Sequence, residues 1–133
     1  MKPQELQIGD LIMAPFYGQK VPCKVVGITK EQIMYEALRP GAHRPGPYVS
    51  NGNNLEPMTL CISYLAAAGW AVKNGPDLMA YIHTEGPVPI RMEWNEENQA
   101  LYIDDALFPT PIGNVHQMQK ILRLLGQPET FAI

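Results

Sequence analysis

The sequence predicts an α+β protein, and three observations on its 133 residues lead to this class. Short apolar runs that alternate with other residues recur in the first third of the chain and again between 78 and 104, as in half-buried strands. Two segments, 59–68 and 114–126, carry the capping residues and apolar spacing of helices. Hydrophobic residues make up 46% of the chain, which is too many for a disordered protein.

We therefore expect the order β-β-β-α-β-β-β-α in a single domain over 1–133, with 1–54 and 55–133 as sub-lobes if the halves pack separately. The first strand is expected at 6–13 and is followed by a turn at 16–19. Alternation over 21–26 predicts the second strand, and the apolar run 33–38 predicts the third. Three short strands joined by tight turns make a meander that fits a small SH3-like barrel.

The middle of the chain has an unusual composition. Residues 39–54 include three prolines, three glycines and three asparagines but no acidic residue, and they predict a long loop without regular structure. Residues 57–72 then contain no charged side chain. Within them we expect a helix that Thr59 caps and Gly69 ends.

The second half of the chain predicts an antiparallel sheet and a final helix. Strands are expected at 78–84, 88–94 and 101–104, and in 88–94 the apolar side chains alternate with Arg91 and Glu93. The final helix has Asn114 as its expected N-cap, with Gln117 three residues later as in a capping box.

No motif for catalysis, phosphate binding or metal binding is present in the sequence. The serines lie outside any G-x-S-x-G turn, no G-x-G-x-x-G occurs, and the histidines and cysteines have no zinc spacing. Cys23 and Cys61 are expected to be buried free thiols. Glu93, Asp104 and Asp105 could approach one another across a hairpin, where we interpret them as its solvated end. We therefore expect no enzymatic activity, no cofactor and no metal.

Three short motifs lie along the chain: an L-x-I-G start, a P-hydrophobic-T helix start with a later Gly-aromatic pair, and a V-H-Q-hydrophobic-Q helix. Their residues are Leu6, Ile8 and Gly9; Pro57, Met58, Thr59, Gly69 and Trp70; and 115–119 with Leu125 and Gly126. In these motifs the chain resembles a family of small uncharacterised proteins of gut bacteria, often found near phage-like or mobile elements. The resemblance implies no established activity and favours a non-enzymatic role.

The first functional hypothesis is a non-catalytic interaction or adaptor module that binds a protein partner or a second copy of itself. A proline-stiffened segment loses little entropy on docking, and Tyr and Arg are common interface anchors. The candidate partner-binding residues are Arg39, His43, Arg44, Tyr48, His116, Gln117 and Gln119. For the last three the alternative is structural: Gln117 completes a cap, while His116 and Gln119 lie on the exposed side of the helix.

The second hypothesis is a nucleic-acid-binding accessory protein of a mobile element. Residues 1–54 carry six Lys/Arg against four Asp/Glu, whereas 55–133 carry four against nine. The candidate contacts in the basic and aromatic meander are Lys20, Lys24, Lys30, Arg44 and Tyr35. An ordinary charged surface is the alternative. No signal-peptide pattern or membrane span is evident, so we expect a cytoplasmic protein without membrane contact.

Overall fold

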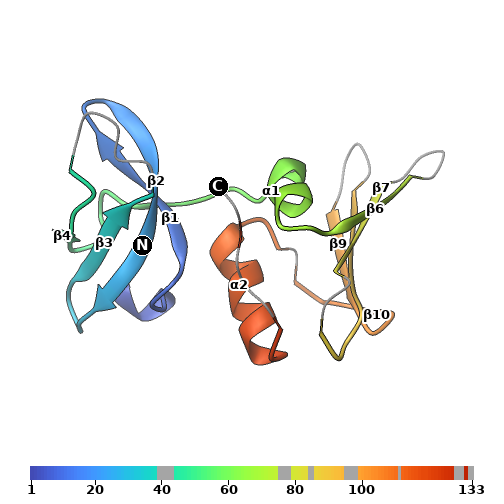
Figure 1. Ribbon diagram of the computed structural model, residues 1–133. Helices are drawn as coiled ribbons and strands as arrows, with labels where there is room; N and C mark the ends of the chain where they lie inside the picture. The colour runs from blue at the N-terminus through green and yellow to red at the C-terminus, as the bar shows by residue number, and fades with distance from the viewer. Residues whose placement is uncertain are drawn as a thin grey trace. The chain divides into compact units, whose positions relative to one another are not determined.

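The computed structural model confirms the α+β class (Figure 1). The structure describes residues 1–38, 44–74, 79–83, 86–94, 99–110, 112–127 and 131. These residues form two antiparallel five-stranded sheets and two α-helices. The chain divides into two compact units, Met1–Thr59 with Asn114–His116 and Leu60–Gly113 with Gln117–Ile133. The expectation that the chain folds as a single domain stays a prediction, and each unit is described by itself.

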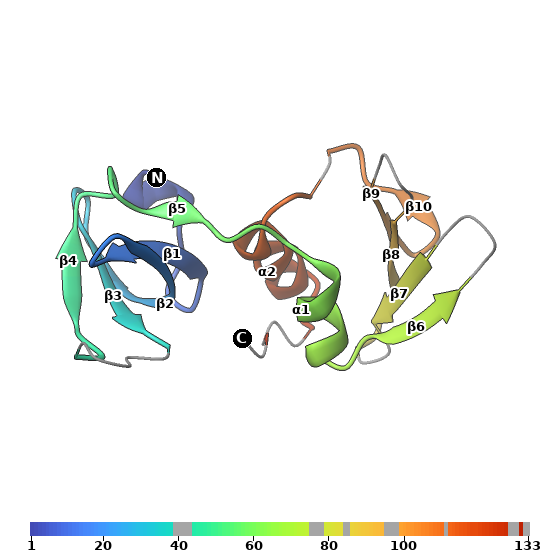
Figure 2. The same cartoon turned by 90° about the horizontal axis from the view of Figure 1, so that it is seen from above.

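The first unit is a meander that closes with a short fifth strand. Its elements are the 3-10 turn η1 (Pro3–Glu5) and the strands β1 (Leu11–Phe16), β2 (Gln19–Ile28), β3 (Ile33–Ala37), β4 (Tyr48–Ser50) and β5 (Glu56–Pro57). The strand order is β4-β3-β2-β1-β5, so the chain returns after β4 to pair with the outer edge of β1 (Figure 2). The SH3-like barrel that the sequence suggests for this part of the chain stays a prediction.

The inner face of this sheet forms the core of the first unit. Cys23 lies opposite both Ile12 and Ala37 in the register, and Val25 lies opposite Tyr35. All five side chains are buried. A bulge between Val25 and Gly27 then shifts the pairing of β2 with β3. The alternation predicted for 21–26 is therefore confirmed up to the bulge.

The first strand begins later than predicted, at Leu11 rather than at residue 6. The preceding residues fold into a turn, in which the Gln7 amide donates to Asp10 Oδ2 at 2.8 Å and the Asp10 amide donates to the Gln7 carbonyl at 3.1 Å. Gly9 allows this turn because its φ is 98°. The apolar pattern of 6–13 does not separate this turn from the strand, since Leu6 is buried as well.

The prediction of a loop without regular structure over 39–54 is wrong in part. Tyr48–Ser50 form β4, which pairs with β3 and places Tyr48 opposite Tyr35. A strand of three residues is too short to produce a visible period of two. Residues 39–43 lie outside the described residues.

The second unit combines a five-stranded meander with helical segments. Its elements are α1 (Ile62–Ala67), β6 (Ala71–Asn74), β7 (Met79–His83), β8 (Ile90–Trp94), β9 (Gln99–Ile103), β10 (Ala106–Leu107) and the part of α2 (Val115–Leu124) from Gln117 onward. The strand order is β10-β9-β8-β7-β6. The sequence analysis did not predict β6 and β10. Both are short; β6 pairs with β7, and β10 pairs with β9.

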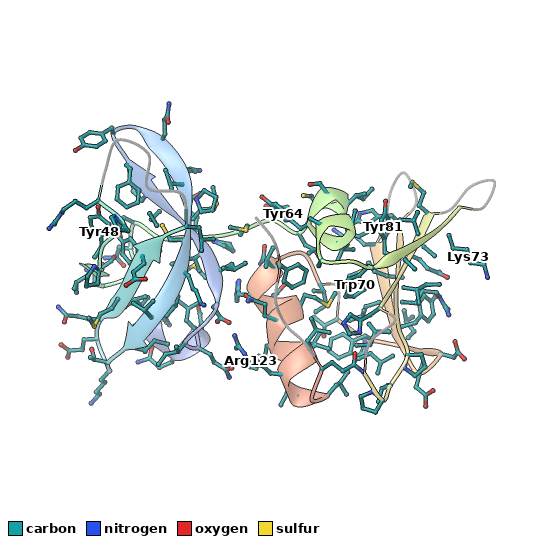
Figure 3. All side chains as sticks on the ribbon, in the orientation of Figure 1. Tyr48, Tyr64, Trp70, Lys73, Tyr81 and Arg123 are labelled. Carbon is teal, nitrogen blue, oxygen red and sulfur yellow. The ribbon has the colours of Figure 1, made fainter. Side chains whose placement is uncertain are left out.

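The helices of the second unit lie on one face of its sheet (Figures 1 and 2). Met92 of β8 lies opposite Tyr81 and Leu101, and all three side chains are buried. Figure 3 shows Tyr81 and Trp70 among the side chains of this unit. Arg91 and Glu93 alternate with the buried residues of β8, which confirms the two faces predicted for this strand.

The start of α1 differs from the prediction. Thr59 does not cap this helix, because it forms a β-bridge with Asn114 and the helix begins after Cys61. The predicted end is confirmed: Gly69 has a φ of 86°, and the Trp70 amide donates to the Leu65 carbonyl at 3.1 Å.

Gln117 binds the segment before α2: its Oε1 accepts from the Gly113 amide at 3.2 Å. The capping box that the sequence predicts between Asn114 and Gln117 stays a prediction. At the other end, Gly126 has a φ of 66° and the Gln127 amide donates to the Leu122 carbonyl at 2.8 Å. Among the described residues, no helix is long and apolar enough to cross a membrane.

Candidate partner-binding surface

The turn between β1 and β2 places an aromatic ring in solvent. This turn consists of Tyr17 and Gly18, whose φ values of 51° and 79° both lie in the left-handed region. Two-residue hairpin turns need such angles, and Asn or Gly adopts them at low cost. A bulky residue is unusual there, and Tyr17 is also 91% exposed. Tyr17 therefore combines backbone strain with the exposure of a large apolar side chain.

An aromatic cluster lies directly beside this turn. Phe16, the last residue of β1, meets Tyr48 edge to face with ring centroids 4.9 Å apart and lies 6.5 Å from Tyr35. Tyr35 and Tyr48 stack with centroids 5.7 Å apart. Burial raises the pKa of Tyr35, and the neighbouring Cys23 and Tyr48 act in the same direction. The cluster thus joins β3 and β4 to the end of β1 by apolar contact.

Tyr48 also positions the segment before β4. Its hydroxyl donates to the Arg44 carbonyl, which brings Arg44 close to the aromatic rings while its own side chain is exposed. Figure 3 shows Tyr48 at the outer part of the first unit. The segments 15–20 and 44–54 contain no acidic residue. We call Phe16, Tyr17, Arg44 and Tyr48 the aromatic tip.

The structure brings together only some of the predicted partner-binding residues. Arg44 and Tyr48 belong to the aromatic tip, while Arg39 and His43 lie outside the described residues. His116, Gln117 and Gln119 all lie on α2.

The structural alternative for the α2 residues is wrong for Gln119, whose side chain is 3% exposed rather than on the outer side of the helix. Gln119 therefore needs a conformational change before it could touch a partner. His116 and Gln117 are half-buried, and Gln117 holds the amide of Gly113.

The predicted nucleic-acid contacts do not form one cationic face. Lys20 makes an ion pair with Glu56, and Lys24 lies opposite Glu36 in the register of β2 and β3. Tyr35 is only 5% exposed, so its ring cannot stack on a base. The predicted Lys30 is exposed in the turn before β3, where its carbonyl accepts from the side-chain amide of Gln4 at 3.0 Å.

A polar cluster lies on the face of the β6–β10 sheet opposite its buried side chains. Arg91 Nε lies 3.0 Å from Glu93 Oε1, and its Nη1 lies 3.0 Å from Asp105 Oδ1. The guanidinium also lies over the Tyr102 ring, 4.5 Å from its centroid. Burial lowers the pKa of Arg91, but the bonds to Asp105 and Glu93 outweigh it and raise the pKa overall. Two of the acids expected to approach across the hairpin therefore meet through Arg91.

The two cysteines lie in different units and differ in burial. Both cysteines are free; Cys23 is buried as expected, whereas Cys61 is half-buried. Burial raises the pKa of the Cys23 thiol to about 11. Within the part of the chain that the structure describes, no three potential ligands gather into a metal site.

The chain matches no family model, no curated protein and no solved structure. The sequence analysis placed Tyr17 in a turn but did not include it among the candidate partner-binding residues. The available signal was a Tyr-Gly pair in a position that usually holds Asn-Gly.

Proposed function

We propose that the protein is a non-catalytic interaction module that binds a protein partner or itself through the aromatic tip. The observation that carries the proposal is Tyr17, which is 91% exposed at a φ of 51°. The left-handed conformation costs an ordinary residue roughly 1–2 kcal/mol, and Asn would lower this cost. No contact within the first unit compensates for it among the described residues. Such a residue is kept at a stability cost when its side chain is needed elsewhere.

The neighbours of Tyr17 support the same function. The stacked rings of Tyr35 and Tyr48 hold the base of the tip rigid, so little conformational entropy is lost on binding. Tyr and Arg are the residue types most enriched at energetic centres of interfaces, and the tip presents both. The proposed location is the cytoplasm, as the sequence predicts, and two free thiols are compatible with a reducing compartment.

Nucleic acid is the alternative ligand. The absence of acidic residues from 44–54 favours it. The ion pair of Lys20 with Glu56, and the position of Glu36 opposite Lys24 in the strand register, reduce the positive charge available to phosphates. The protein-binding function is therefore better supported.

Site-specific photo-crosslinking in the host cell tests the proposal. A benzophenone amino acid replaces Tyr17 in one variant and Ile8 in a control, because Ile8 is also exposed (64%) but lies outside the aromatic tip. We expect a protein adduct from position 17 and not from position 8. An adduct that nuclease removes would favour the alternative, and equal labelling from both positions would contradict the proposal.

A further inference from the structure

We infer that the partner of the aromatic tip is a second copy of this chain, bound through the β9–β10 hairpin of its second unit. The inference rests on the proposed function and adds the identity of the partner. Its basis is the complementary charge and apolar character of two exposed hairpin ends that lie in different units.

The charge of the two units is unequal. The second unit contains four Lys/Arg and eight Asp/Glu, a formal charge of −4, whereas the first contains six and five, a charge of +1. At the aromatic tip, segments 15–20 and 44–54 contain no acidic residue; Lys20 is paired with Glu56, so Arg44 supplies the charge that the tip offers a partner. The tip therefore favours an acidic partner surface, which the second unit of another copy supplies.

The β9–β10 hairpin has the acidic and apolar groups that this contact needs. Its turn consists of Asp104 and Asp105, with φ values of 50° and 63°, and both residues are exposed. Asp105 is held by Arg91, but no ion pair joins Asp104 to another described residue. Leu107 of β10, three residues after Asp104 in the chain, is 60% exposed, so this hairpin also presents an apolar side chain to solvent.

The aromatic tip and the β9–β10 hairpin thus each offer one exposed apolar side chain and one charged side chain. We pair Tyr17 with Leu107 and Arg44 with Asp104, so that an apolar contact and an opposite-charge contact form together. Arg91 and Tyr102 hold the acidic turn on a strand pair, while the stacked tyrosines hold the tip, and both surfaces are therefore ordered before they meet.

The contact is heterologous, because the surface on one copy differs from the surface on the next. A complex of two copies still has one unused tip and one unused hairpin, so wild-type protein adds further copies as its concentration rises. Two hairpin ends form an interface at the small end of the range, below about 1,200 Å², which is typical of weak and transient complexes. Association is expected at protein concentrations of about 0.1–1 mM.

Sedimentation velocity on the full chain tests the inference by complementation. A tip variant carries Tyr17→Asn and Arg44→Ala, and a hairpin variant carries Asp104→Asn and Leu107→Thr. Asn tolerates left-handed angles at positions 17 and 104, and Thr suits a strand, so circular dichroism should show both variants folded. We expect each variant alone to associate at least about tenfold more weakly than the wild type.

A mixture of the two variants decides the geometry. The hairpin variant keeps an intact tip and the tip variant keeps an intact hairpin, so the mixture should form a dimer that does not grow further. Raising the salt from about 50 to 500 mM should weaken this dimer, since the Debye length falls severalfold. The control Ile8→Asn should associate as the wild type does.

Three results would overturn the inference. Wild-type protein could remain monomeric at about 1 mM in low salt, the mixture could fail to dimerise, or the hairpin variant could associate as strongly as the wild type. If the crosslinks from position 17 then lead to a different protein, the proposed function stands while the second copy is excluded. If position 17 gives no crosslink, both fail.

Discussion

Replacing Gly86 with alanine should destabilise the second unit for two separable reasons. Gly86 has a φ of +105°, and a Cβ placed on it would lie 2.5 Å from Gln127 Cγ and 2.6 Å from Gln127 Cδ. Gln127 cannot move away freely, because its side chain is buried and its Nε2 donates to the Val88 carbonyl at 2.6 Å. The substitution therefore forces both backbone strain and the displacement of a buried amide.

The magnitude follows from these two costs. A positive φ costs an L residue roughly 1–2 kcal/mol. Breaking the bond from Gln127 to Val88 leaves buried polar groups without partners, which costs roughly another 1–3 kcal/mol. We expect Gly86→Ala to lower the free energy of unfolding by about 2–5 kcal/mol, a large part of the 5–15 kcal/mol typical of a domain.

Two other glycines of the same unit provide matched controls. Gly69 has a φ of +86° but no heavy atom within 4 Å of an added Cβ, so Gly69→Ala should cost only the free energy of holding alanine at a positive φ. Gly113 has neither a positive φ nor a close neighbour, and Gly113→Ala should stay within about 1 kcal/mol of the wild type. Urea unfolding followed by tryptophan fluorescence suits the series, because Trp70 and Trp94 both lie in this unit.

A double-mutant cycle isolates the clash. In a Gln127→Ala background the Cβ of Ala at position 86 no longer meets Gln127 Cγ, Cδ or Nε2, so the free-energy cost of Gly86→Ala should fall toward that of Gly69→Ala. The reasoning fails if Gly86→Ala and Gly69→Ala cost the same in the wild-type background, or if Gln127→Ala leaves the cost at position 86 unchanged.

Three further changes have defined outcomes. Burial raises the pKa of the Cys23 thiol from 9.0 to about 11, so stability that is fully present below pH 9, on the order of a few kcal/mol, should be lost as the pH rises through 11. Urea unfolding between pH 9 and 11 should show a smaller pH dependence of the unfolding free energy in Cys23→Ala than in the wild type, and an equal dependence would contradict this. Iodoacetamide should label Cys61 before Cys23. Asp105→Asn should lower the free energy of unfolding by about 0.5–1 kcal/mol, because it removes an exposed ion pair with Arg91. Salt screens such a pair, so an equal loss in urea unfolding at high salt would contradict this explanation. Ile12→Ala should cost about 2–5 kcal/mol by circular dichroism because its side chain is fully buried, and a cost below about 1 kcal/mol would contradict its place in the core.

The fold class was predictable because apolar periodicity is a local property of the chain. Alternation identified β2 and β8, and the glycine after α1 fixed the end of that helix. The short strands β4 and β10 escaped prediction because two or three residues contain no measurable period. Their existence depends on the hydrogen bonds that a neighbouring strand offers.

The candidate surface was predictable only in part. Arg44 and Tyr48 were selected from composition, but the role of Tyr17 depends on its backbone angle and exposure, neither of which a sequence states. For the alternative nucleic-acid face, the sequence does not show that Glu36 lies opposite Lys24, because that neighbourhood depends on the register of β2 and β3.

The sequence by itself determined that the chain alternates strands with helices and that 57–72 carries no charge. It could not determine whether that uncharged segment is core or surface. The tertiary structure decides this residue by residue: Met58, Leu60 and Leu65 are buried, while Ile62 is 38% exposed. The physical reason is that uncharged side chains are compatible with burial but do not enforce it. Which face of the segment is covered depends on residues distant in the sequence, and only folding brings those residues into contact.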